Sequence, residues 1–192
     1  MRRKRFALFL AAGALCLTAA LGLTVYNIWD EQRAAASASE AVEALAKAIP
    51  ERPETEQPPT TEPQPVMTSV ELDERYYVGL LEIPELGLTL PVQREWSETL
   101  LHYSPCVYKG TLADGLIIAG HNYRSHFSPI KSLSTGAEVL FLDLDGNVWT
   151  YTVTAIEIID GTDVEAMEAG PRRDIARAEY YYFTGQPEKA AR

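Results

Sequence analysis

His121 is the residue whose type and surroundings most directly indicate chemistry. It follows an apolar run, Leu116 to Ala119, and a glycine, within the sequence GLIIAGHNYRSHF. A short apolar run that stops at a glycine predicts a buried strand ending there, so the imidazole is expected at the rim of a sheet. In a cysteine–histidine pair, such an imidazole holds the thiol as a thiolate and later protonates a leaving amine. The alternative is a structural histidine that only completes the packing.

The other two histidines indicate less. His121 and His126 form an H-x4-H pair, but a helical zinc pair prefers a different spacing and no third ligand is evident. We therefore expect neither a metal nor another cofactor. His102, in the sequence ETLLHY, is interpreted as a surface or packing residue.

The chain has two cysteines, Cys16 and Cys106, and no C-x-x-C pair. This pattern disfavours a structural zinc site or a thioredoxin-like motif. Cys16 lies in an apolar run and is interpreted as a small apolar residue. Cys106, in SPCVYKG, is then a free thiol that is either buried and inert or exposed and reactive, and burial is the favoured prediction.

The N-terminus predicts a membrane anchor. Residues 1–5 contain four consecutive basic side chains, and residues 6–29 contain no charge. Since about 20 apolar residues cross a bilayer core, residues 6–29 suffice as a transmembrane helix, with Tyr26 and Trp29 at an interfacial aromatic belt. The basic cluster predicts a single-pass protein of the cell membrane with a cytoplasmic N-terminus and an extracellular domain. A cleavable signal peptide, a lipoprotein signal and a buried core helix are the weaker alternatives.

Composition and charge exclude some partners. The 192 residues carry a formal net charge of -10, from 27 acidic and 17 basic side chains. A chain this acidic, with no basic cluster beyond its first residues, is not expected to bind nucleic acid. Its length fits one domain with appendages.

The rest of the chain divides by composition. Residues 30–75 are interpreted as a helical segment, over 30–49, followed by a spacer that is rich in proline over 50–65 and holds a domain off the membrane. Residues 76–170 have the character of a domain built from short strands. Residues 171–192 form a divergent tail with no predicted secondary structure.

Strand patterns dominate the domain. The predicted strands are 76–84, 88–92, 116–120 and a hairpin within 138–159 that turns at Asp145-Gly146-Asn147. Closely spaced strands with little helix between them predict a mainly β fold, either a barrel or a sandwich. Single helical turns are predicted at 126–133 and around 163–168.

Three stretches resemble the sortase family. They are IPELGLTLPV (83–92), SPCVYKGTLADGLIIAGHNYRSHFSPI (104–130) and STGAEVLFLDLDGNVWTYTV (134–153). The resemblance covers residues 76–169 in order and is most specific at IAGHN and at the pattern that begins at Gly136. A membrane anchor followed by a spacer is also similar to the usual sortase layout.

The resemblance implies a fold and an activity. Sortases are exported cysteine transpeptidases, mainly of Gram-positive bacteria, built on an eight-stranded β-barrel. A cysteine attacks a peptide bond in a C-terminal sorting signal and forms a thioester. An amine of the cell-wall precursor or of a pilin then resolves the thioester. The catalytic set is a histidine, a cysteine at a strand end in a T-L-x-T-C-type motif, and an arginine in the next strand; His121 matches the histidine.

The cysteine of the family has no match. Its place falls within residues 176–185, which read ARAEYYYFTG. An alignment from Asp174 puts Tyr180 at the nucleophile's position, and an alignment on YFTG puts Gly185 there. Neither residue forms a thioester, and no arginine is assigned to the oxyanion. We therefore expect a sortase-like barrel that is incomplete at its C-terminal strands and has exposed edges.

Three explanations of this mismatch stay open. A shifted reading frame or a truncation after Gly170 is one, and a natural loss of catalysis is another. Recruitment of Cys106 is disfavoured, because its loop resembles family sequence that has its own separate cysteine. The sequence thus predicts a membrane-anchored sortase-family transpeptidase, joining surface proteins to cell-wall or pilin amines, that is impaired in this chain. The alternative is a catalytically inactive, sortase-like module that binds sorting-signal peptides.

Overall fold

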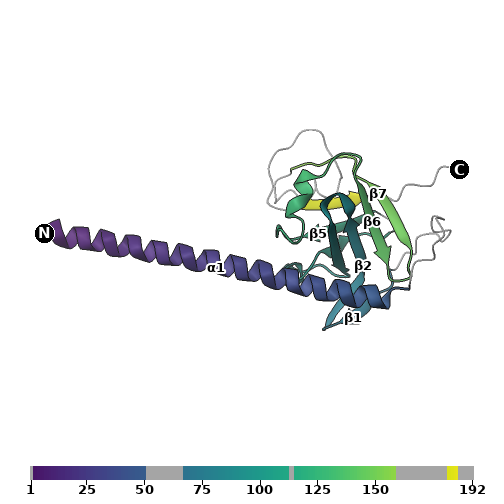
Figure 1. The fold of residues 1–192 in the computed structure, drawn as a ribbon, viewed down its shortest axis with the longest axis horizontal. Helices are drawn as coiled ribbons and strands as arrows, with labels where there is room; N and C mark the ends of the chain where they lie inside the picture. The colour runs from purple at the N-terminus through teal and green to yellow at the C-terminus, as the bar shows by residue number, and fades with distance from the viewer. Residues whose placement is uncertain (1, 51–66, 113–114, 159–180, 186–192) are drawn as a thin grey trace.

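A computed structural model describes residues 2–50, 67–112, 115–158 and 181–185 (Figure 1). A single long helix projects from a domain that is made mostly of strands. This arrangement confirms the predicted fold class, a mainly β domain preceded by an N-terminal apolar helix.

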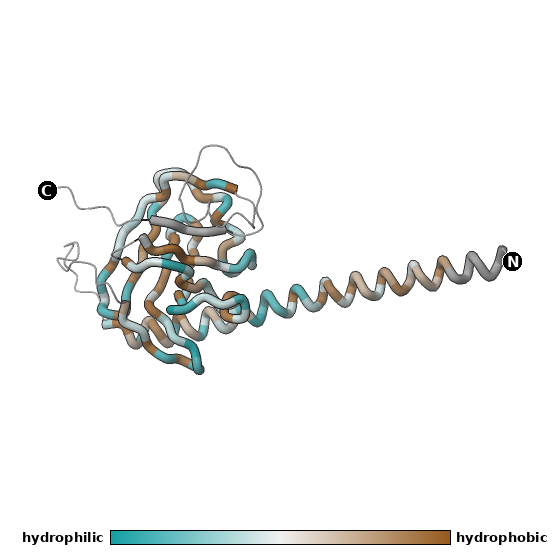
Figure 2. Tube along the Cα trace, turned by 180° about the vertical axis from the view of Figure 1, so that it is seen from behind, coloured by the Kyte–Doolittle hydropathy of each residue, from teal (hydrophilic) through white to brown (hydrophobic). Residues whose placement is uncertain are grey.

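The projecting half of the helix α1 (Arg2–Ala48) is apolar and exposed. Its large apolar side chains are exposed, from Phe9, 74% exposed, to Ile28, 51% exposed. Figure 2 shows this half as mainly apolar, with hydrophilic residues where it reaches the domain. The helix is long and apolar enough to cross a membrane. At about 1.5 Å per residue, the stretch from Phe9 to Trp29 spans about 30 Å, the thickness of a bilayer core.

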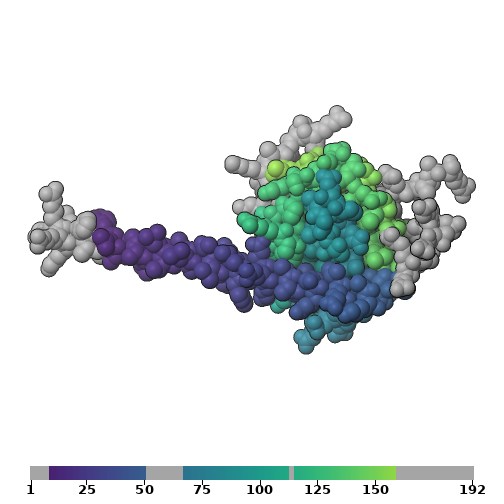
Figure 3. Space-filling model, in the orientation of Figure 1, coloured from purple at the N-terminus to yellow at the C-terminus, as the bar shows by residue number. Residues whose placement is uncertain are grey.

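The second half of α1 packs on the sheet. One face carries side chains that are all less than 8% exposed, namely Ala34, Ala38, Ala41, Leu45 and Ile49. Spacings of three and four residues place them in one stripe. Ala41, Leu45 and Ile49 pack against Tyr77 and Leu80. The space-filling view shows α1 lying against the domain along this part of its length (Figure 3).

The sheet follows the order β7-β6-β2-β3-β4-β5-β8, with β1 paired to β2 outside this path. Its strands are β1 (Val70–Leu72), β2 (Arg75–Ile83), β3 (Leu88–Gln93), β4 (Cys106–Lys109), β5 (Leu116–Gly120), β6 (Glu138–Asp143), β7 (Val148–Thr152) and β8 (Tyr181–Gly185). All pairs are antiparallel except β3 with β4. Within the described residues β7 and β8 do not pair, so the curled sheet forms an open half-barrel.

The interior of the half-barrel is the main core. Its largest fully buried side chains include Phe127, Phe141, Leu81 and Ile118. Short helical turns connect consecutive strands, namely η1 (Pro84–Leu86), α2 (Glu98–Leu101) and η2 (Ser128–Ser132). The predicted strands at 76–84, 88–92 and 116–120, the hairpin and the turn at 126–133 are all observed.

Other elements differ from expectation or lie outside the described residues. The sequence did not predict β1, β4 or α2, which are too short to show a period; Ser97 caps α2 by accepting a hydrogen bond from the Leu100 amide at 3.1 Å. The strand β8 lies in the tail for which no structure was predicted. The helical turn predicted around 163–168 lies outside the described residues.

The packing of α1 changes the interpretation of the spacer. Because residues 34–49 already contact the sheet, α1 itself sets the distance between the domain and the apolar stretch. Of the proline-rich segment 50–65, only Pro50 lies within the described residues. The turn at Gly146 lies beside Pro50, at the far end of the docked helix.

The docking of α1 is tested by Leu45→Ala. Leu45 is fully buried, so its truncation leaves a cavity and is expected to lower the free energy of unfolding by about 2–4 kcal/mol. Urea unfolding of the full chain in detergent micelles measures this change. The control is Lys47→Ala, which removes an exposed ion pair with Glu43 and is expected to change stability by less than about 1 kcal/mol. Equal effects of the two variants would show that this face of α1 is not packed.

Candidate active site around His121

Strand β5 places His121 at the rim of the sheet. All five residues from Leu116 to Gly120 are buried, between β4 on one side and β8 on the other. His121 is the next residue, and it is half-buried. The strand-end position predicted for the imidazole is therefore observed.

Gly120 is required by close packing. A Cβ atom on Gly120 would lie 2.4 Å from the ring of Phe127, which is fully buried. The Phe127 amide also donates a hydrogen bond to the His121 carbonyl, at 3.2 Å. The glycine therefore lets the loop 121–127 fold back over the end of β5. This folded loop fixes the backbone position of His121.

Four rings meet at this rim. His121 stacks on Tyr123 with 3.8 Å between ring centroids and 16° between ring planes. His102, which caps the C-terminus of α2, lies 5.1 Å from His121. His126 meets the edge of Tyr123 at 5.3 Å. The expectation of a surface or packing role for His102 missed its place beside His121.

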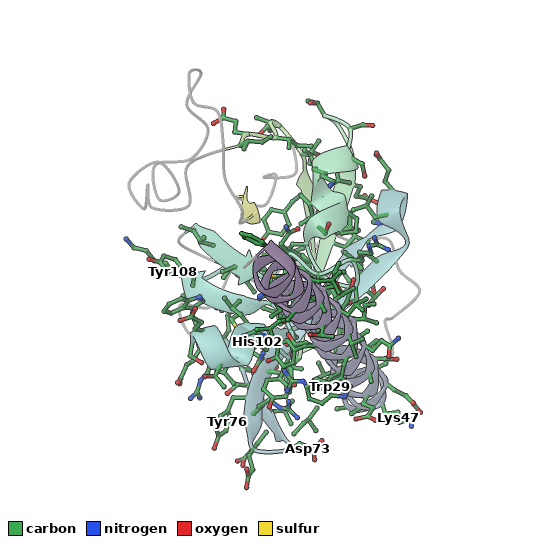
Figure 4. All side chains as sticks on the ribbon, turned by 90° about the vertical axis from the view of Figure 1, so that its left-hand side faces the viewer. Trp29, Lys47, Asp73, Tyr76, His102 and Tyr108 are labelled. Carbon is green, nitrogen blue, oxygen red and sulfur yellow. The ribbon has the colours of Figure 1, made fainter. Side chains whose placement is uncertain are left out.

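A carboxylate from α1 completes this cluster. The Tyr123 hydroxyl donates a short hydrogen bond to Asp30 Oδ2. His102 Nδ1 lies 2.6 Å from the Tyr123 oxygen and 3.4 Å from Asp30 Oδ2. Because the phenol proton goes to Asp30, His102 Nδ1 must carry a proton and donate it to Tyr123. Figure 4 views the molecule from the side on which α1 projects, with His102 beside the helix.

Further contacts hold α1 at the same end of the domain. Asp30 Oδ1 pairs with Arg33 at 2.8 Å, and Glu31 Oε1 accepts a hydrogen bond from the Arg124 amide at 2.9 Å. Arg33 and Arg75 both lie over the ring of Tyr103, at 5.0 and 4.3 Å. Two consecutive helix residues, Asp30 and Glu31, therefore bind the loop that carries His121.

Burial favours the neutral form of two imidazoles, His121 and His126. It lowers the pKa of His121, with a further lowering from nearby His102 and an opposing effect of Asp30. His126 is fully buried, and burial lowers its pKa to about 4. At neutral pH His121 is therefore an uncharged ring that can accept a proton. Its Nδ1 atom is buried and has no hydrogen-bond partner within the described part of the chain.

Cys106 is buried and unreactive. It lies on β4 opposite Ala119 and is 0% exposed, which confirms the favoured prediction of burial. Burial raises the pKa of its thiol to about 12, so the thiolate is negligible at neutral pH. The sulfur lies 3.4 Å from the Ser104 carbonyl and 3.6 Å from Gln93 Nε2. Cys16, the other cysteine, is exposed on the apolar half of α1.

The register of β8 places the two ends of this strand relative to His121. Tyr181 lies opposite Gly120, beside His121, and Gly185 lies opposite Leu116 at the other end of β5. Gly185, one of the two positions aligned with the nucleophile of the family, thus pairs at the end of β5 that is farther from His121. Tyr180, the other aligned position, lies outside the described residues.

Sequence reasoning missed three contributors to the site, Asp30, His102 and Tyr123. The contact between Asp30 and Tyr123 joins residues that are 93 positions apart. Only the position of Asp30, directly after the apolar stretch, gave any local signal. Among the described residues no group of three or more His, Cys, Asp or Glu side chains is arranged to hold a metal ion.

Comparisons with known proteins point to one family. A family model described as a sortase domain matches residues 81–179, just over half of the chain, and runs past Gly170, where the resemblance was expected to stop. Sortase A of Bacillus anthracis is 29% identical over 161 residues, which cover 77% of this chain and 74% of that protein.

Solved structures with a similar chain path include other proteins of this kind. Sortase A of Listeria monocytogenes is 23% identical, with a TM-score of 0.46, over 59% of this chain and 88% of that chain. A pilus-related sortase C of Group B Streptococcus is 18% identical, with a TM-score of 0.48, over 84% and 97%. The sortase C1 of Streptococcus suis is 22% identical, with a TM-score of 0.42, over 46% of this chain and 54% of that chain. The chain thus spans about half the length of that structure.

The close packing at the strand end is tested by Gly120→Ala. The added methyl group meets the Phe127 ring, so either the ring or the loop must move, and overpacking of this kind costs about 1–3 kcal/mol. Thermal or urea unfolding of the full chain in micelles measures the loss. Gly115→Ala is unsuitable as a control because of its positive φ, whereas Gly22→Ala, in open space on α1, is expected to leave stability unchanged. A loss no larger than that of Gly22→Ala would contradict the packing.

The burial of His126 predicts a pH dependence. Its pKa is about 4 in the folded chain and 6.5 in the unfolded chain, so between these values the unfolded state binds more protons. Stability therefore falls as the pH drops through this window, by about 2 kcal/mol between pH 7 and pH 5 from this residue alone. His126→Phe should remove that share of the pH dependence in urea unfolding. If His126→Phe leaves the difference in the free energy of unfolding between pH 7 and pH 5 unchanged, burial of His126 does not cause this pH dependence.

Proposed function

Because the chain belongs to the sortase family of cysteine transpeptidases, we propose that it acts at the cell surface on C-terminal sorting signals of exported proteins. Its second partner in that role is the amine of a cell-wall precursor or of a pilin. We further propose that the transpeptidation step is impaired in these 192 residues. The three parts of this proposal rest on His121, on the two cysteines and on α1.

His121 is proposed as the general acid. It matches the family histidine in the sequence IAGHN, and it stands at the end of β5 beside strand β8. Its lowered pKa leaves the ring neutral at neutral pH, able to take a proton from a nucleophile and return it to a leaving amine. The half-buried ring face is held by Tyr123.

The burial of Cys106 is the main support for the proposal that transpeptidation is impaired. A thioester requires a thiolate near the imidazole, and this thiol is fully buried with a pKa of about 12. Cys16 lies on the apolar half of α1, which is proposed to be in the membrane. The sequence ARAEYYYFTG, where the family cysteine is expected, supplies no thiol. Neither cysteine is therefore placed to attack a peptide.

The continuity of α1 supports a membrane-apposed orientation. The basic residues 2–5 favour a cytoplasmic N-terminus and an extracellular domain. Asp30 and Glu31, directly after the apolar stretch, contact the loop 121–127. At about 1.5 Å per residue, Pro50 lies about 30 Å further along the helix axis. The His121 end of the domain therefore faces the membrane, and the β6–β7 turn points away.

The alternative from a different class is a binding module without turnover. The burial of Cys106 also favours this alternative. A domain with a buried thiol keeps the fold and the residues around His121 but lacks a nucleophile. The two functions differ in a single measurable respect, the cleavage of a bound peptide.

A peptide assay separates these functions. The full chain in detergent micelles is expected to bind fluorescent sorting-signal peptides saturably by anisotropy, and to cleave them no faster than the peptide hydrolyses alone. Cys106→Ala should leave both results unchanged, because the thiol takes no part. His121→Ala should also leave cleavage at background.

Two outcomes contradict the proposal. Cleavage that Cys106→Ala or His121→Ala abolishes would show an intact cysteine transpeptidase. A lack of saturable binding would show that this chain does not bind sorting-signal peptides. The exposed Lys131→Ala variant is the control for both measurements.

A further inference from the structure

The orientation of His121 depends on a ring rather than on a hydrogen bond. Its buried Nδ1 atom has no partner within the described residues, whereas catalytic histidines are commonly oriented by a bond to their second nitrogen. The stacked ring of Tyr123, 3.8 Å away and nearly parallel, is the contact that limits rotation of the imidazole. What holds Tyr123 therefore also holds His121.

Tyr123 is held by a carboxylate from outside the domain's own sheet. Its hydroxyl donates to Asp30 Oδ2, while Arg33 binds Asp30 Oδ1 at 2.8 Å. Both oxygens of this carboxylate are thus occupied, and Asp30 is only 7% exposed. Two independent partners fix the carboxylate, so the phenol ring has one defined position.

We propose that Asp30 is a positioning residue for His121, which it acts on through the hydroxyl and the stacked ring of Tyr123. The proposal rests on the role of His121 as the general acid. It makes the first turn of α1 beyond the apolar stretch a part of the site, although that turn is 91 residues before His121 in the sequence. Removing α1 would leave the Tyr123 hydroxyl without its acceptor and the imidazole without its fixed neighbour.

A simple tether is the competing explanation. Glu31 also binds the same loop, through the Arg124 amide at 2.9 Å, but within the described part of the chain it makes no hydrogen bond to the rings. If the role of α1 is only to tie down the loop, the loss of either carboxylate should have a similar effect. If Asp30 acts through Tyr123, only its loss should change His121. Glu31→Gln is therefore the matched control for Asp30→Asn.

The experiment is histidine NMR on the full chain in micelles. The chain has three histidines, so ¹³C-labelled histidine gives three ring signals, which His→Gln variants assign. The titratable and charged neighbours of His121 are His102, His126, Tyr123, Asp30 and Arg33. Titrations of the unaltered chain, Asp30→Asn, Glu31→Gln and Tyr123→Phe measure the pKa and the ring chemical shifts of His121.

Asp30→Asn is expected to lower the pKa of His121 further, since the carboxylate favours the charged imidazolium. It should also move the His121 ring protons downfield, because the shielding ring of Tyr123 is released. Tyr123→Phe keeps the ring and the Asp30–Arg33 pair, so it should reproduce the downfield movement with a smaller change of pKa. Glu31→Gln should leave both unchanged.

The result that overturns the proposal is a His121 signal that moves no more in Asp30→Asn and Tyr123→Phe than in Glu31→Gln. Tyr123→Phe keeps this test decisive even if Asp30→Asn loosens the docked helix. These signals need no peptide, so a failure of peptide binding would contradict the proposed function without affecting this measurement.

Discussion

The packing of one stripe of α1 on the sheet is the constraint on which the rest of the structure depends. Small and branched apolar side chains, from Ala34 to Ile49, recur every three or four residues and bury one face of the helix. Because the helix is continuous, this packing also fixes the residues one turn before it, Asp30 and Glu31. An apolar stretch long enough to cross a membrane and the loop of a candidate active site are thereby joined by a single continuous helix.

The chemistry at the rim follows from that constraint. Asp30 determines the position of the Tyr123 hydroxyl, the phenol ring stacks on His121, and burial keeps the imidazole neutral. His121 is therefore a neutral ring held at the rim of the sheet, whereas Cys106, on the strand next to β5, is buried in the core. Under the proposed function, this sortase-family domain keeps His121 as its proton-transfer group, while neither Cys16 nor Cys106 is placed to act as its nucleophile. The family match to residue 179 shows that the relationship extends into the segment where the nucleophile is expected.

Much of the strand structure is predictable because its signals are local. The apolar run before His121 and the alternation after the turn at Gly146 indicate strands directly. Other features depend on contacts between distant residues. The stripe on α1 is periodic, but its alanines resemble an ordinary helical spacer, and only the sheet shows what they pack against. Asp30 and Tyr123 are 93 residues apart, so their bond follows from the docking of α1 and from no local pattern. Gly120 combines a local feature with a tertiary one. Its place at the strand end was predictable from the sequence, but its close contact with Phe127 was not.

The most direct test of the account is a nuclear Overhauser measurement between two rings in the full-length chain in micelles. Because α1 holds the hydroxyl of Tyr123, the ring of this residue lies flat against His121, with 3.8 Å between centroids. Strong cross-peaks are therefore expected between the His121 ring protons and the aromatic protons of Tyr123. An absence of these cross-peaks, in a chain whose β5 amides show native contacts with β4, would contradict the claim that the docked helix positions the imidazole.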